Sequence, residues 1–73
     1  MSSIYELLEN GRKAYRAMAD AEVIAAMEGH MHLDVDPVQD GIVDEDGRLS
    51  DRDAAVRELC RADERELRLL GFD

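Results

Sequence analysis

Two histidines and two aspartates alternate with apolar residues in the middle of the chain, at positions 30–36. If this stretch is a β-strand, its alternate side chains share one face, and the polar ones are His30, His32, Asp34 and Asp36. Imidazole and carboxylate groups are ligands of zinc and other divalent transition metals. Neighbours on one face of a strand lie about 7 Å apart, so four consecutive ligands do not surround one ion. A solvated acidic strand with incidental histidines explains the pattern better, and we expect no metal and no other cofactor.

A run of acids before Gly47 has the look of half an EF-hand loop: Asp44, Glu45 and Asp46. With Gly47 at position 6 of such a loop, Ile42 takes position 1, where calcium requires an oxygen ligand. We therefore predict a tight turn in place of a calcium site.

The residue sets of common catalytic sites are missing from the sequence. It contains no phosphate-binding glycine loop, no Ser-His-Asp set and no basic patch. The one cysteine, Cys60, lies on the apolar side of a predicted helix, where a buried and inert thiol is the usual case. We predict no catalytic residues and no enzyme activity for this chain.

The net charge of −9 comes mostly from one segment. Residues 28–47 hold seven acids and no lysine or arginine, whereas acids and bases nearly cancel in 1–27 and 49–70. Concentrated negative charge steers a positively charged partner and can imitate a nucleic acid backbone, while it disfavours direct binding to nucleic acid. The residues predicted to bind a basic protein partner are Asp34, Asp36, Asp40, Asp44, Glu45 and Asp46. An acid-rich surface that reflects the host organism is the alternative interpretation.

Residues 3–28 are predicted to be helical. Ser3 and Glu6 have the spacing of a capping box, which starts a helix. Asn10-Gly11 predicts a break, and Gly29 predicts an end. Asp20 is suited to cap a separate helix, so the sequence leaves open one kinked helix or two.

Residues 29–48 are predicted to form a loop or a short β-hairpin. The alternation favours a strand that ends at Pro37, and Ile42-Val43 is a second short apolar run. Asp40-Gly41 and Glu45-Asp46-Gly47 are turn signals. Because two short strands alone are marginal in water, a loop packed on the helices fits nearly as well.

A C-terminal helix is predicted over residues 50–70. Ser50 and Asp53 have the spacing of a capping box, and Gly71 stands where a left-handed residue ends a helix in a Schellman motif. Between them, an apolar stripe recurs at intervals of three and four residues: Val56, Leu59, Cys60, Leu67 and Leu70. Asp63 interrupts this stripe, which predicts a kink or a new helix start there.

Length and composition fit one small folded domain. The chain has 73 residues, of which 45% are hydrophobic and 37% charged. Because so short a chain buries a limited core, a partner or a second copy in a homodimer would add stability. One cysteine rules out an internal disulfide and is typical of the reducing cytoplasm. We expect neither a signal peptide nor a membrane span, since the apolar runs are far shorter than ~20 residues.

Two segments resemble the small (α) subunit of protocatechuate-type aromatic-ring-opening dioxygenases, the LigA-like family. In the first, from Arg12 to Glu22, a basic–aromatic stretch around Tyr15 leads to Asp-x-Glu, similar to a helix of that family. The second is similar to the family's Leu-Ser/Thr-x-x-Glu…Asp-x-x-x-Leu-x-x-Leu-Gly ending and consists of Leu49-Ser50, Asp53, Asp63, Leu67, Leu70 and Gly71. Together they cover about half of the chain. The resemblance implies a non-catalytic helical subunit that packs over the active site of a larger enzyme subunit.

We predict a mainly α fold, a small helical domain with an acidic loop or short β-hairpin inserted between two helical halves. The favoured function is interaction. The protein is expected to be a cytoplasmic accessory subunit or inhibitor, comparable to phage-type nucleic-acid mimics, that docks on a basic protein surface. A LigA-like small subunit is the second alternative. The third is a divalent-metal-binding protein that uses His30, His32, Asp34 and Asp36.

Overall fold

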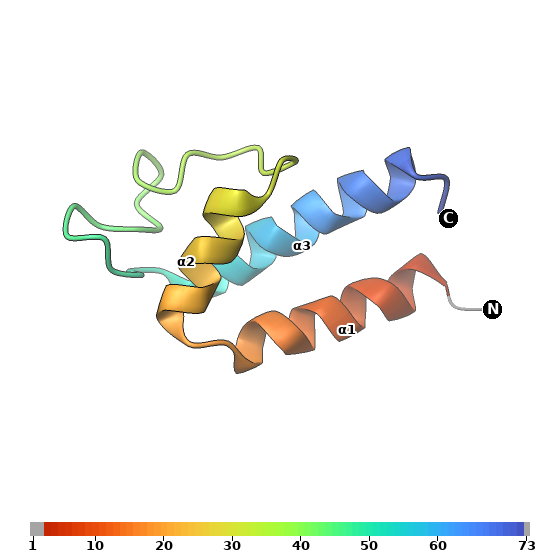
Figure 1. The fold of residues 1–73 in the computed structure, drawn as a ribbon, viewed down its shortest axis with the longest axis horizontal. Helices are drawn as coiled ribbons and strands as arrows, with labels where there is room; N and C mark the ends of the chain where they lie inside the picture. The colour runs from red at the N-terminus through yellow and green to blue at the C-terminus, as the bar shows by residue number, and fades with distance from the viewer. Residues whose placement is uncertain (1–2, 73) are drawn as a thin grey trace.

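Three helices provide the regular secondary structure of residues 3–72, the part of the chain that the computed structural model describes. They are α1 (Ile4–Ala17), α2 (Asp20–Gly29) and α3 (Arg52–Leu69). Helices α1 and α3 run side by side, α2 packs on α3 toward one end of the pair, and both termini lie at the other end (Figure 1). The predicted mainly α fold is confirmed. We call residues 30–51, which join α2 to α3, the acidic loop.

Helix α1 begins at the predicted cap. The Ser3 hydroxyl accepts a hydrogen bond of 3.2 Å from the backbone N–H of Glu6, which satisfies one of the free N–H groups of the first turn. The predicted break at Asn10-Gly11 is wrong, because α1 continues through both residues. A Cβ on Gly11 would lie 3.5 Å from Asp63 Oδ2, so this glycine sits where α1 packs on α3. Tertiary packing there overrides the low helix propensity of glycine.

Helices α1 and α2 are separate, which answers the question that the sequence leaves open. Met18 and Ala19 between them have extended backbone, with ψ angles of 151° and 158°. The Glu22 carboxylate accepts a hydrogen bond from the Ala19 N–H at 2.9 Å and so caps α2. The helix ends at Gly29, as predicted.

Arg52, the first residue of α3, joins the ends of all three helices. Its guanidinium donates to the backbone oxygens of Arg16, at 2.9 Å, and of Met18. It also pairs with the Asp20 carboxylate at 2.7 Å. The carbonyl groups at the end of α1 have no partner within that helix and carry partial negative charge, so a cation stabilises them.

The N-cap of α3 is Asp51, and the predicted capping box at Ser50 is wrong. The Asp51 carboxylate accepts a hydrogen bond from the Ala54 N–H at 3.1 Å. The Ser50 hydroxyl donates instead to the backbone oxygen of Gly41, at 2.6 Å. Ser50 is thus occupied in closing the acidic loop, and the adjacent carboxylate takes the capping position.

The C-terminus of α3 has the predicted Schellman backbone. Gly71 has a φ angle of +95°. Its N–H donates to Arg68 at 3.1 Å, and the N–H of Phe72 donates to Leu67 at 3.0 Å. No new helix starts at Asp63, because α3 is one uninterrupted helix of 18 residues.

Turns build the acidic loop, and the strand expected over 30–36 does not form. Within residues 3–72, the only strand-like pairing is one isolated antiparallel bridge between Val43 and Leu49. The segment 30–36 has no partner strand, and Leu33 and Val35 pack on the core from an irregular backbone. Of the two alternatives for this insertion, the protein adopts the loop.

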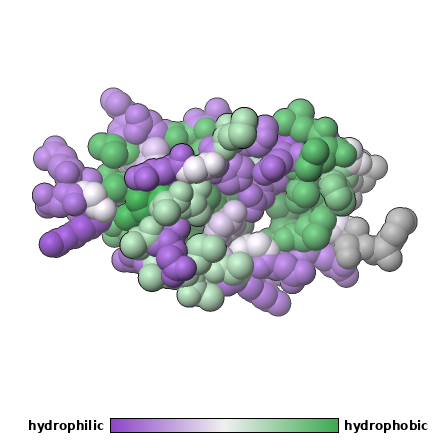
Figure 2. Space-filling view, viewed as in Figure 1, coloured by the Kyte–Doolittle hydropathy of each residue, from purple (hydrophilic) through white to green (hydrophobic). Residues whose placement is uncertain are grey.

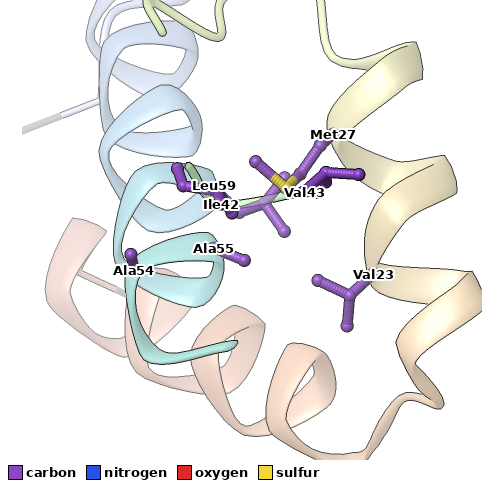
Figure 3. Packing of buried hydrophobic residues seen from close by; sticks show 7 residues of the cluster. All are labelled: Val23, Met27, Ile42, Val43, Ala54, Ala55 and Leu59. Carbon is purple, nitrogen blue, oxygen red and sulfur yellow. The ribbon is translucent and has the colours of Figure 1, made fainter. Parts of the chain in front are cut away.

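The hydrophobic core lies between α2, α3 and the acidic loop (Figure 3). Its members are the buried residues Val23 and Met27 of α2, Ala54, Ala55 and Leu59 of α3, and Ile42 and Val43 of the loop. The predicted stripe is only partly buried: Val56 and Leu59 are buried, whereas Leu70 is exposed. Alanines of α3 take the missing places because their small side chains allow α2 and the loop to approach closely.

The molecule is elongated, with a longest extent of 43 Å. The acidic loop lies at one end, and hydrophobic residues gather over the other end, near the termini (Figures 1 and 2). We call this second region the apolar end; its exposed members are Tyr5 (72%), Leu69 (74%), Leu70 (68%) and Phe72 (43%). No helix within residues 3–72 is long and apolar enough to cross a membrane.

Candidate functional site

Six exposed carboxylates make the acidic loop the most highly charged part of the molecule, and they are those that the sequence analysis selects: Asp34, Asp36, Asp40, Asp44, Glu45 and Asp46. None of the six lies within 4.0 Å of a basic nitrogen of residues 3–72. Acids on the helices differ, since Glu9, Asp20 and Glu64 each pair with an arginine. The loop therefore presents uncompensated negative charge to the solvent.

Two of these carboxylates also hold the loop in shape. Asp36 Oδ1 accepts hydrogen bonds from two backbone N–H groups at 3.1 and 3.2 Å. Asp44 Oδ1 accepts two more, at 2.9 and 2.8 Å. Such bonds stabilise Asx turns. The turn at Asp44 contains Gly47, where we predict a tight turn in place of a calcium site. Asp34, Asp40, Glu45 and Asp46 are the members of the set whose side chains are not used in this way.

A polar cluster lies around Asp63, on the side of α3 that faces α1 and the end of α2. The Tyr15 hydroxyl donates to Asp63 Oδ2 at 2.7 Å, and His30 Nε2 lies 2.7 Å from Oδ1. The backbone N–H of His32 donates to His30 Nδ1 at 3.2 Å. Because Nδ1 accepts that bond, the proton of a neutral imidazole is on Nε2, which donates to Asp63. This chain of hydrogen bonds connects α1, α3 and the acidic loop.

Glu66 extends the cluster by one turn of α3. Its Oε2 lies 3.9 Å from His30 Nε2, and its side chain is half exposed. Donor atoms of His30, Asp63 and Glu66 all lie within 4.8 Å of one another, and they form the only such group of three in residues 3–72. We call Tyr15, His30, Asp63 and Glu66 the Asp63 cluster.

The four residues of the alternative metal-binding set are not brought together. Only His30 of the four belongs to the Asp63 cluster, while Asp34 and Asp36 remain exposed in the loop. His32 lines the same cleft as His30. Asp63 and Glu66 are not predicted as site residues from the sequence, because they lie more than 30 positions from His30. One signal in the sequence pointed to Asp63: it is an acid that interrupts the apolar stripe of a predicted helix, and a charge at such a position needs a partner.

Burial decides the protonation of Tyr15. Desolvation, followed by the hydrogen bond to Asp63, raises the pKa of the Tyr15 hydroxyl well above its usual value of 10.0. The hydroxyl is protonated at neutral pH even at its usual pKa, and the raised pKa keeps it a donor at higher pH.

Cys60 lies at a groove of about 260 Å³ between α1 and α3, which four arginines line: Arg12, Arg16, Arg57 and Arg61. Burial and the charge of Asp63 raise the pKa of the thiol, against the lowering effect of Arg12 and Arg16. The reactive form of cysteine is the thiolate, so a raised pKa does not favour a nucleophile here.

Comparison with known proteins adds no relative. No protein-family model matches the chain, and neither a curated protein nor a solved structure is significantly similar to it. The resemblance to the LigA-like family stays a prediction from two sequence segments.

Proposed function

We propose that the protein is a small non-enzymatic interaction protein that docks on a basic surface of a partner through its acidic loop. The observation that carries this proposal is the set of six exposed carboxylates without a basic partner among the described residues. In the helices, by contrast, four acids pair with arginines: Glu9, Asp20, Glu58 and Glu64. An accessory subunit or an inhibitor of a nucleic-acid enzyme is the form that we favour.

Electrostatics supports this form of docking. Charges of one sign that project from one end of a protein steer an oppositely charged partner and raise the association rate. The carboxylates are spread along an irregular loop, so they present a series of negative charges to a basic groove, as the phosphates of a nucleic acid do. A nucleic-acid mimic is therefore part of the proposal. Direct binding to nucleic acid does not, because phosphates would be repelled. The single thiol supports a cytoplasmic setting.

The test replaces only the four carboxylates that do not accept turn hydrogen bonds. The loop variant carries Asp34→Asn, Asp40→Asn, Glu45→Gln and Asp46→Asn. A matched control removes the same four charges from helices: Glu9→Gln, Asp20→Asn, Glu58→Gln and Glu64→Gln. Circular dichroism establishes that both variants keep the fold.

A partner is first captured from host lysate, and its affinity for each protein is then titrated at two salt concentrations. We expect the loop variant to bind at least about tenfold more weakly, with a flatter salt dependence, while the control stays near the parent protein. Equal losses in both variants would mean that net charge alone matters. Unchanged affinity in the loop variant would place the interface on the helices.

A LigA-like small subunit remains the second candidate. What supports it is that Tyr15 and Asp63, one from each of the two resembling segments, are joined by a hydrogen bond of 2.7 Å. Such a subunit would bind through its helices. The loop variant would then retain its affinity for the large subunit of a ring-cleavage dioxygenase.

We further propose that the protein forms a homodimer through the apolar end. Four exposed apolar side chains lie there, at the opposite end of a 43 Å molecule from the acidic loop. Two copies that meet through this surface keep their acidic loops far apart, which minimises repulsion. Burial of exposed aliphatic and aromatic area supplies the attraction.

A further inference from the structure

An open cleft of about 360 Å³ lies between the C-terminal end of α2 and α3. Four side chains with metal-binding groups line it: His30, His32, Asp63 and Glu66. This group differs from the alternative set considered from the sequence, because its carboxylates come from α3 and not from the acidic loop.

The donor atoms have distances that suit one ion. A zinc ion with bonds of about 2.0–2.2 Å holds tetrahedral ligand atoms roughly 3.3 Å apart. His30 Nε2 lies 2.7 Å from Asp63 Oδ1 and 3.9 Å from Glu66 Oε2. These two distances bracket the required value, and ligand atoms of all three residues lie within 4.8 Å of one another.

The surrounding structure orients these ligands. Asp63 and Glu66 are three positions apart on one helix, which places both carboxylates on the same face of α3. Tyr15 donates to Asp63 Oδ2 and leaves Oδ1 directed at the imidazole. A carboxylate fixed by an outer hydrogen bond is a feature of metal sites in proteins.

From this geometry we propose that the Asp63 cluster binds a divalent transition metal ion of the zinc class. The ligands are His30 Nε2, Asp63 Oδ1 and Glu66 Oε2. The fourth position is taken by water or by the imidazole of His32, whose ring centroid lies 6.1 Å from that of His30. Three protein ligands with water in the fourth position form a known coordination of zinc in proteins.

Without the ion, the same groups satisfy one another by hydrogen bonds, so the fold does not depend on metal. Binding of the ion to Nε2 requires the proton of the neutral imidazole to be on Nδ1, which can then no longer accept the hydrogen bond from the His32 N–H. Metal binding therefore removes one hydrogen bond at the start of the acidic loop. A chelator should leave the far-UV circular dichroism of the protein unchanged, while added zinc should raise its melting temperature.

The decisive variant is Glu66→Gln. The Glu66 side chain is half exposed and lies too far from His30 for a hydrogen bond, so its substitution leaves the metal-free fold intact. Glu64→Gln is the matched control, because it removes the same charge from the same helix at a carboxylate that pairs with Arg68. Asp34→Asn tests the ligand set that the sequence suggests, and His32→Gln tests the fourth position.

Co²⁺ serves as the spectroscopic probe, and calorimetric titration with Zn²⁺ gives affinity and stoichiometry. We expect one ion per chain with visible absorption of four-coordinate Co²⁺, at least about tenfold weaker binding in Glu66→Gln, and parent-like binding in Glu64→Gln and Asp34→Asn. Absence of binding by the parent protein would overturn the proposal. Equal losses in Glu66→Gln and Asp34→Asn would do the same, since they would indicate diffuse attraction to an acidic surface.

Discussion

At the end of the molecule that carries α2, the acidic loop covers a core in which Leu59 is fully buried. At the other end, α1 and α3 extend beyond α2, and the apolar end stays open to solvent (Figures 1 and 2). Charge and hydrophobicity are thus segregated along the long axis. The loop places its apolar residues Ile42 and Val43 inside and its carboxylates outside. At the apolar end, no third element within residues 3–72 covers the ends of α1 and α3.

This difference teaches that the loop has two physical roles in one segment. Its apolar residues complete the core that α2 and α3 alone would leave exposed. Its carboxylates stay in water, where they avoid the desolvation cost of burial and a basic partner can reach them. The apolar end exposes hydrophobic side chains to water, so covering it with another surface is favourable.

The largest expected effect comes from truncating the buried end. Leu59→Ala should lower the free energy of unfolding by ~2–5 kcal/mol, because it leaves a cavity in the core. Leu67 lies toward the apolar end and is half-buried. Leu67→Ala should therefore lower the free energy of unfolding clearly less than Leu59→Ala. Urea denaturation of both variants measures the contrast. Equal losses would contradict the distinction between a packed end and an open one.

The second prediction concerns the apolar end. Replacing both Leu69 and Leu70 by Ser should weaken self-association at least about 100-fold, since each leucine contributes roughly 1.5–3 kcal/mol when fully buried and each substitution occurs twice in a homodimer. Analytical ultracentrifugation over a concentration series gives the association constant. Val38→Ser is the control, because Val38 is an exposed apolar residue of the acidic loop. A parent protein that is monomeric at all concentrations would refute the dimer.

A smaller effect is expected where the two ends meet, at the Asp63 cluster. Tyr15→Phe should cost about 1–2 kcal/mol, because the half-buried Asp63 carboxylate loses a donor. Tyr5→Phe, at an exposed position, should change the free energy of unfolding by less than about 0.5 kcal/mol.

The cost of Tyr15→Phe also depends on pH in a defined direction. The folded-state pKa of Tyr15 lies above its unfolded value of 10.0. Its contribution to stability is therefore complete below about pH 10 and declines as the pH rises from there through the folded-state pKa. Denaturation at pH 8 and pH 10.5 tests this. A difference between parent and variant that is the same at both pH values would contradict the raised pKa.

Much of the fold follows from local signals in the sequence. The Ser3 cap, the end of α2 at Gly29 and the Schellman ending at Gly71 depend on residues within a few positions of one another. Two local predictions, the break at Asn10-Gly11 and the cap at Ser50, are wrong because tertiary contacts compete. Gly11 packs against α3, and the Ser50 hydroxyl closes the acidic loop.

The candidate sites divide in the same way. The six carboxylates of the acidic loop are visible in the sequence, since a run of acids without bases needs no fold to be recognised. The Asp63 cluster is not, because its hydrogen bonds join residues 48 and 33 positions apart. In the sequence, Asp63 only interrupts an apolar stripe. In the folded protein, it forms hydrogen bonds with Tyr15 and His30.

By itself, the sequence determined that the chain is mainly helical, where two of its helices end, and that one segment holds most of the charge. These properties depend on propensity, periodicity and charge, which act over one or two helical turns. Only the tertiary structure decided that α1 and α2 separate at Met18, that Arg52 ties three helix ends together, and that one end remains apolar and open. Those features arise from packing between segments distant in the chain, where burial and hydrogen bonds outweigh local preference.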